Sequence, residues 1–109
     1  MGSDTGNPIA ELQELQARVQ AMMMEKQQLM MQQADIDRAL KALKDVEGKA
    51  YEMIGTLLVE REKEAINKDL IERKQMVELR LEGVDKNERT MRSRIQSLAE
   101  RIEGRKGGG

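Results

Sequence analysis

The 109-residue chain is rich in charge and nearly free of aromatic side chains. Charged residues make up 36% of it, aromatic residues 1%, and the formal net charge is −1. So few bulky side chains exclude a compact core of ordinary type, and a composition of this kind is typical of long helices and coiled coils. The near-neutral charge gives no general attraction to nucleic acid or to an anionic membrane.

A first helix is predicted over residues 7–47, after residues 1–6, which are short and polar and which we expect to be disordered. Asn7 is the expected N-cap, Pro8 occupies the first helical position, and Gly48 follows the last turn. Apolar residues recur along this helix with the 3-4 spacing of a coiled coil. The predicted seam, meaning the row of residues that faces a partner helix, consists of Leu12, Leu15, Val19, Met22, Lys26, Leu29, Gln33, Ile36, Leu40 and Leu43.

Residues 48–62 are predicted to form a β-hairpin, because two short apolar runs flank the turn pair Gly55-Thr56. A buried loop or a helical turn is the alternative, and a helix would have to contain both Gly48 and Gly55. Alternation divides the apolar side chains into two faces: Tyr51, Met53 and Leu58 on one, and Ile54, Leu57 and Val59 on the other. A lone hairpin is marginal in water, so we expect this one to serve as an assembly element that joins strands of other chains.

A second helix is predicted over residues 63–103, followed by a flexible tail over residues 104–109. Acidic residues four positions before basic ones, such as Asp37–Lys41, Asp69–Arg73 and Asp85–Arg89, are expected to stabilise the helices. The seam of the second helix consists of Leu70, Lys74, Val77, Leu81, Val84, Glu88, Met91, Ile95, Leu98 and Ile102.

The two seams can be matched as an antiparallel two-helix coiled coil. Pairing Leu43 with Leu70 brings every later layer into line and places Lys26 opposite Glu88, the one pair of opposite charges in the seam. We expect this polar layer to help fix the register at some cost in stability. The alternative is that both long side chains extend to solvent.

These residues together resemble the β-type subunit of prefoldin, in its archaeal form. The resemblance covers roughly residues 9–103 and is most specific in AYEMIGTLLVE, where an aromatic residue, an apolar pair with glycine, and a second apolar run precede a charge. It continues through LIERKQMVELRLEGVDKNERTMRSRIQSLAERI. The resemblance implies a mostly α fold with one hairpin that joins an inter-subunit β-barrel.

The resemblance also implies a function as a cytoplasmic co-chaperone. In this family, two α subunits with two hairpins each and four β subunits with one hairpin each form a hetero-hexamer. The distal ends of its coiled coils hold unfolded client proteins and pass them to a group II chaperonin, without ATP. The implied partners are therefore an α-type subunit, other copies of this chain, unfolded clients and a group II chaperonin.

Candidate client contacts are the apolar residues near the chain ends and the methionines of the first helix, since methionine adapts to many apolar partners. At the seam ends these residues could instead close the last layers, and Met23 and Met30 could pack beside the seam. The candidate set is Ile9, Leu12, Leu15, Met22, Met24, Met31, Leu98 and Ile102.

Enzymatic chemistry is not expected. Without histidine or cysteine the chain lacks the usual zinc ligands and activated nucleophiles, so we predict no catalytic residues, no metal and no cofactor. We also expect no nucleic-acid partner, because the basic stretch over residues 86–106 has no interleaved aromatic residues. No apolar run approaches the ~18 residues of a membrane span. The alternative function is a structural coiled-coil adaptor that never binds unfolded chains.

Overall fold

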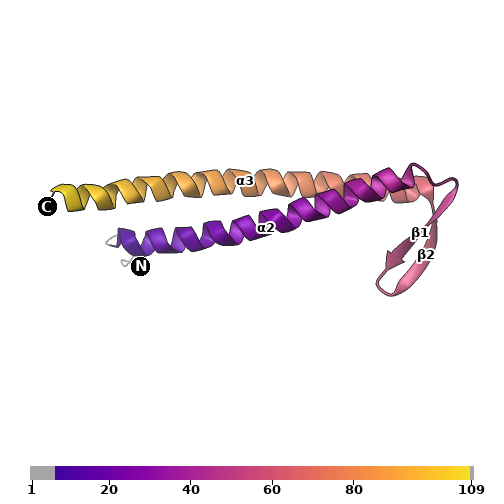
Figure 1. The fold of residues 1–109 in the computed structure, drawn as a ribbon, viewed down its shortest axis with the longest axis horizontal. Helices are drawn as coiled ribbons and strands as arrows, with labels where there is room; N and C mark the ends of the chain where they lie inside the picture. The colour runs from indigo at the N-terminus through magenta and orange to yellow at the C-terminus, as the bar shows by residue number, and fades with distance from the viewer. Residues whose placement is uncertain (1–6, 109) are drawn as a thin grey trace. The chain divides into compact units, whose positions relative to one another are not determined.

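The structure, a computed structural model, describes the backbone of residues 7–108 and the side chains of residues 7–104. Helices α2 (Pro8–Leu43) and α3 (Lys63–Gly108) are separated in the chain by strands β1 (Lys49–Ile54) and β2 (Leu57–Glu62) (Figure 1). The predicted fold class of two long helices with one antiparallel hairpin is thereby confirmed. Residues 1–6, which we predicted to be disordered, lie outside the described residues.

The chain divides into two compact units, each containing one segment of α2 and one of α3. The terminal unit comprises the chain up to Gln27 and from Glu82 onward, and the hairpin unit comprises Gln28–Leu81. The terminal unit buries Val19, Val84 and Leu98; the hairpin unit buries Leu29, Leu43, Ile66 and Val77. Among the described residues no polar or charged residue is buried, so each core is purely apolar.

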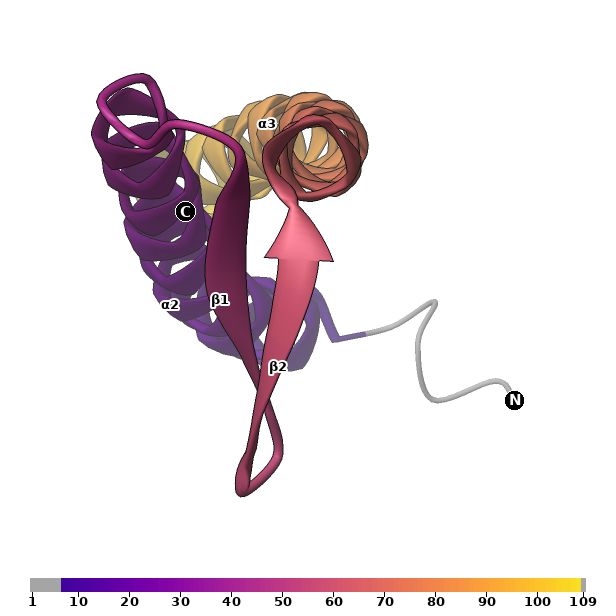
Figure 2. The same ribbon diagram turned by 90° about the vertical axis from the view of Figure 1, so that its right-hand side faces the viewer.

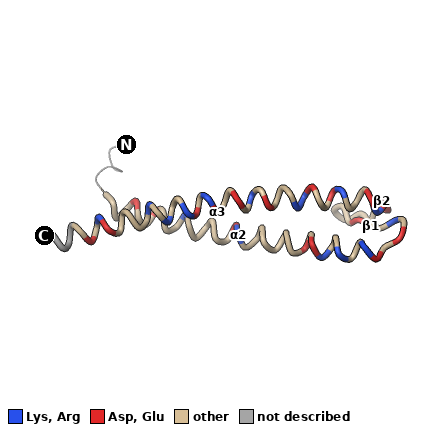
Figure 3. The backbone as a smooth tube through the Cα atoms, turned by 90° about the horizontal axis from the view of Figure 1, so that it is seen from above, with Lys and Arg blue, Asp and Glu red and all other residues tan. Residues whose placement is uncertain are grey.

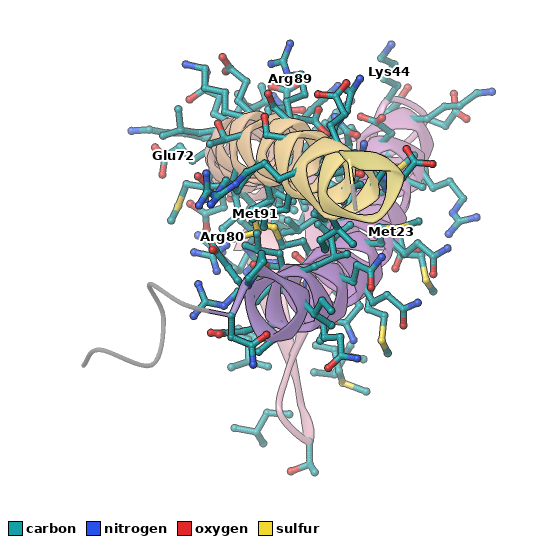
Figure 4. All side chains as sticks on the ribbon, turned by 90° about the vertical axis from the view of Figure 1, so that its left-hand side faces the viewer. Met23, Lys44, Glu72, Arg80, Arg89 and Met91 are labelled. Atoms are coloured by element: carbon teal, nitrogen blue, oxygen red, sulfur yellow. The ribbon has the colours of Figure 1, made fainter. Side chains whose placement is uncertain are left out.

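The predicted seams face inward in both units. All of the predicted seam positions are buried or half-buried, including the polar ones, Lys26, Gln33, Lys74 and Glu88. Met91, a seam residue of the terminal unit, lies between its two helix segments (Figure 4). The 3-4 spacing therefore identified the buried face of each helix correctly.

Helix α2 begins as its sequence predicts and ends earlier than predicted. The Asn7 side-chain oxygen accepts a hydrogen bond from the Ala10 amide at 3.0 Å, which is the N-cap geometry. The helix stops at Leu43 rather than near Glu47, because the amides of the next three residues bond to carbonyls three positions back and tighten the last turn. The Lys63 ammonium caps the exposed Lys44 carbonyl at 3.2 Å.

Strand β2 passes directly into α3, since Glu62 ends the strand and Lys63 begins the helix. The Lys63 amide donates to the Gly48 carbonyl at 2.9 Å, and Gly48 has φ +80°. Gly48 thus supplies its left-handed backbone at the entrance to β1, not at the end of α2 as predicted. Helix α3 continues to Gly108, so residues 104–108, predicted as part of the tail, are helical in the structure.

The hairpin is a two-stranded antiparallel sheet that extends away from the adjoining ends of α2 and α3 (Figure 2). Its register pairs Met53 with Leu58 and Ile54 with Leu57, so the connecting loop is Gly55-Thr56. Gly55 has φ +61° while Thr56 has no positive φ, which fits a type II′ turn with glycine at its first central position. The two strands and their turn span residues 49–62.

Candidate assembly and client-binding surfaces

Five large apolar side chains of the hairpin are left uncovered by the rest of the hairpin unit, with exposed fractions between 54% and 67%. We call the set the apolar hairpin surface; it consists of Tyr51, Met53, Ile54, Leu57 and Leu58. Cross-strand partners share a face, so Met53 and Leu58 lie on one side of the sheet and Ile54 and Leu57 on the other. The sheet therefore offers apolar side chains on both faces at its turn end, as the alternation predicts.

Four charged side chains hold the root of the hairpin to α3. We call them the root cluster; they are Glu52 on β1, Arg61 on β2, and Asp69 and Arg73 on α3. Arg61 Nη1 lies 2.6 Å from Glu52 Oε1 and 2.7 Å from Asp69 Oδ2, and Arg73 Nη2 lies 3.4 Å from Glu52 Oε2. The hydrogen bonds to Glu52 and then to Asp69 raise the pKa of Arg61 above its ordinary value.

The opposite face of the hairpin carries a smaller polar group beside Tyr51. Its hydroxyl donates to Glu60 Oε1 at 3.3 Å, and Lys49 Nζ lies 3.4 Å from Glu60 Oε2. A groove of about 410 Å³ runs below Tyr51, between the end of α2 and the first turns of α3. Leu43, the buried Ile66 and Tyr51 all line it, and the Tyr51 side chain remains 64% exposed.

The predicted Lys26–Glu88 layer of the terminal unit includes a third charge. Lys26 Nζ lies 3.7 Å from Glu88 Oε1 but only 2.7 Å from Asp85 Oδ1. The hydrogen bond to Asp85 is the largest of the causes that raise the pKa of Lys26, with smaller contributions from Glu88. Glu88 also accepts from Arg92 Nε at 2.9 Å. The role of the Lys26–Glu88 layer in fixing the register stays a prediction.

Two further ion pairs cross between the helices, one in each unit. In the terminal unit, the Arg94 guanidinium donates to both carboxylate oxygens of Glu11, at 3.0 and 3.2 Å. In the hairpin unit, Lys74 Nζ lies 2.7 Å from Asp37 Oδ1, and this hydrogen bond raises the pKa of Lys74. Lys74 is a seam position, whereas Arg94 is not. Both pairs contribute modestly, because all four side chains are partly in solvent.

Helix α2 has a stretch in which charge is nearly absent. Between Val19 and Ala34 it carries only Glu25 and Lys26 as charged residues, whereas basic and acidic residues alternate along α3 (Figure 3). Four methionines project from this stretch into solvent: Met23, Met24, Met30 and Met31. Flexible, uncharged methionine side chains exposed in this way can contact apolar segments of many sequences.

Comparison with known proteins identifies the family. A family model described as "Prefoldin subunit" matches residues 7–108. The chain belongs to the prefoldin family. Prefoldin subunit beta of Archaeoglobus fulgidus is 29% identical and that of Methanosarcina acetivorans 32% identical over 99 residues, covering 89% of this chain and 85% of each relative. The crystal structure of the prefoldin beta subunit from Thermococcus strain KS-1 has the same fold, with a TM-score of 0.82 and 21% identity over 89% of this chain and 87% of that one.

These relatives confirm the predicted resemblance to the β-type prefoldin subunit, a chaperone subunit. Within the prefoldin fold, the candidate client contacts differ in how far their side chains are exposed to solvent. Ile9, Met24 and Met31 are exposed, while Leu98 has no exposed surface. Four others are half-buried: Leu12, Leu15, Met22 and Ile102. The exposed residues can therefore meet a client directly, and Leu98 can do so only if the two helices separate.

Sequence reasoning missed the root cluster, although part of its signal was present. Glu52 and Arg61 fall on the same face of the predicted hairpin, where a cross-strand pair is favourable. Their contacts with Asp69 and Arg73 depend on the angle between the hairpin and α3, which alternation does not specify. The buried Ile66, one turn before the predicted start of the second seam, was also missed.

Other kinds of site find no support in the described part of this prefoldin chain. It contains no group of three or more histidine, cysteine or acidic side chains that could hold a metal ion. Within residues 7–108, neither helix has a stretch that is long and apolar enough to cross a membrane.

Proposed function

We propose that this chain is a subunit of an ATP-independent holdase, a chaperone that binds unfolded proteins and prevents their aggregation. In this proposal four copies join two α-type subunits in a cytoplasmic hetero-hexamer, and the hexamer delivers its clients to a group II chaperonin. The chain has no enzymatic role of its own. The observation that carries the proposal is the uncovered apolar hairpin surface, in a chain whose family consists of chaperone subunits.

The apolar hairpin surface has the properties of an assembly element. Burying one large apolar side chain completely contributes about 1.5–3 kcal/mol, so five that are more than half exposed could contribute roughly 5–9 kcal/mol. Association costs about 4–15 kcal/mol in lost freedom, so one such contact is marginal. A closed barrel of several hairpins buries both faces and pairs both strand edges, which is why we expect the hairpins to assemble in this way.

The client-binding surface is proposed on the exposed apolar residues of α2. Ile9 and Met24 belong to the terminal unit, and Met31 repeats the Met24 position one heptad further along the helix. Each of these side chains alone would bind a client weakly. Several of them on the subunits of one hexamer, acting on one client, give a much higher avidity, which suits a protein that must hold many different sequences and release them.

The test combines this chain with an α-type prefoldin subunit and measures native mass and suppression of client aggregation in the absence of nucleotide. The double variant Leu57→Ser/Leu58→Ser should prevent assembly. Leu79→Ser is the matched control, since Leu79 on α3 is 70% exposed and Leu57 is 67% exposed. Normal assembly of the hairpin double variant would refute the assembly role.

The client surface is tested in the same samples with Met24→Gln/Met31→Gln. Both methionines are 67% exposed, and Met76 on α3, 72% exposed, provides the matched control Met76→Gln. The α2 double variant should assemble normally and protect clients several-fold less well. A complex that assembles but never suppresses aggregation in its wild-type form would establish the structural adaptor instead.

A further inference from the structure

The hairpin is joined to the helices of its unit in two different ways. On one side Glu62 is followed by Lys63 without a loop, so the end of β2 is also the start of α3. On the other side residues 44–48 connect α2 to β1 and include Gly48 with its positive φ. The backbone bond from the Lys63 amide to the Gly48 carbonyl closes the end of the hairpin at this junction. The φ and ψ angles there stay free to rotate, so one such bond does not by itself fix the angle between strand and helix.

Apolar packing fixes this angle only weakly. The large apolar residues of the hairpin are mostly exposed, and on the face that carries Glu52 and Arg61 only Ala50 and Val59 are half-buried apolar residues. What remains on that face is the root cluster. Glu52 is its most enclosed member, with a side chain 17% exposed, although it lies on a two-stranded sheet.

The geometry of the root cluster is that of a brace with two arms. Arg61 reaches from β2 to Asp69 on α3 while it also binds Glu52 on β1, at 2.7 and 2.6 Å. Glu52 in turn contacts Arg73, one helical turn beyond Asp69, at 3.4 Å. Two charges on the sheet and two on the helix thus alternate in sign, and each sheet residue contacts the helix. Both bonds leave the same Arg61 nitrogen, Nη1, whose N–H groups point in fixed directions within the guanidinium plane, so one side chain can hold two carboxylates.

We propose that the root cluster sets the angle between the hairpin and α3, and so presents the apolar hairpin surface in the orientation that assembly requires. Glu52, Arg61, Asp69 and Arg73 are positioning residues in this proposal, since they act through the apolar hairpin surface and need not touch another subunit. The proposal rests on the assembly role proposed above for the hairpin. Salt should weaken the brace, because its members are partly in solvent.

The test measures the orientation directly. The chain contains no cysteine, so Thr56→Cys in the turn and Glu78→Cys on α3, both exposed positions, can be spin-labelled without other changes. Labelled chain is diluted into unlabelled chain, so that only distances within one chain are seen. Arg61→Met should widen the distance distribution at least twofold. Arg38→Met, which removes an exposed ion pair with Asp35 within α2 of the same unit, is the matched control and should leave the width unchanged.

A conservative variant separates positioning from simple packing. Arg61→Lys keeps the charge but loses the planar group with its fixed donor directions, and should give an intermediate width. A distribution as narrow as the wild type in Arg61→Met overturns the proposal, and so does equal widening in Arg38→Met. Arg61→Met could instead unfold the hairpin, which would show as lost hydrogen-exchange protection of the hairpin amides. In that case Arg73→Met replaces it, since this variant removes only the 3.4 Å contact with Glu52. Arg73→Met should also widen the distance distribution, and an unchanged width would overturn the proposal.

Assembly with an α-type subunit gives the second readout. Arg61→Met should raise the concentration needed for half-maximal assembly at least fivefold, with no change for Arg38→Met. Normal assembly by Arg61→Met, together with failure by Leu57→Ser/Leu58→Ser, would overturn the brace and leave the assembly role intact. Normal assembly by both variants would instead refute the assembly role itself.

Discussion

The apolar residues near the chain ends could either close the last layers of the coiled coil or contact clients. Leu98 can distinguish these two roles, because packing requires a buried side chain and client contact requires an exposed one. Its side chain has 0% exposure, the lowest among the described residues. Replacing a buried leucine by alanine costs about 2–5 kcal/mol through lost apolar contact and the cavity left behind. Two helices can partly close such a gap, so we expect Leu98→Ala to cost about 2–3 kcal/mol. With a urea m-value of about 1–3 kcal/mol/M, the midpoint should fall by roughly 0.7–3 M.

The assay follows helix content in urea for Leu98→Ala, Ile9→Ala and the exposed control Leu79→Ala, with client protection measured on the same samples. Both exposed variants should stay within about 0.5 kcal/mol of the wild type, because neither leaves a cavity. Ile9→Ala should nevertheless protect clients less well. If Leu98→Ala unfolds at the same urea concentration as Leu79→Ala yet loses client protection, Leu98 acts on an open surface and the reasoning from its burial is wrong.

Three other predictions concern the seam, the glycines and pH. Replacing Lys26 and Glu88 together by leucine should raise the melting temperature by a few degrees, since a polar layer gives way to an apolar one; a lower melting temperature would contradict this. Gly55→Ala should destabilise the hairpin by about 1–2 kcal/mol, because φ at this position is +61°. Gly83→Ala should instead stabilise α3 by about 0.5–1 kcal/mol, because the new methyl group has open space around it. Amide hydrogen exchange measures both changes. Lys26 and Lys74 have pKa values raised above 10.5 by hydrogen bonds to aspartates on the facing helix, so their contribution is full below about pH 10.5 and is lost as pH rises through the raised values. Arginine at both positions should remove this alkaline loss of stability, and an unchanged loss in unfolding titrations would refute the assignment.

The features that the sequence predicted well are those governed by local periodicity. The seams of both helices follow from 3-4 spacing, and the two apolar faces of the hairpin follow from alternation. Asn7 and Gly55 act as their chemistry suggests, one as an N-cap and one as a turn residue. In each case the determining residues lie within a few positions of one another, so no knowledge of the tertiary arrangement was needed.

The features that the sequence failed to predict depend on which elements meet. Asp37, Asp69 and Asp85 were expected to pair with basic residues four positions along their own helices. Their closest basic partners in the structure are instead Lys74 on the facing helix, Arg61 on the hairpin, and Lys26. The spacing rule describes an isolated helix, whereas a second element placed beside an aspartate offers it a better donor.

The direct passage of β2 into α3 constrains how the length of this chain can vary. One residue inserted between Glu62 and Lys63 would either move every side chain of β2 to the other face of the sheet or turn α3 by about 100° relative to the hairpin. Residues 44–48 form neither strand nor α-helix, so a residue gained or lost there would change local hydrogen bonds without shifting the phase of a strand or helix. Insertions and deletions around the hairpin should therefore be confined to the segment that connects α2 to β1 and to the turn between the strands.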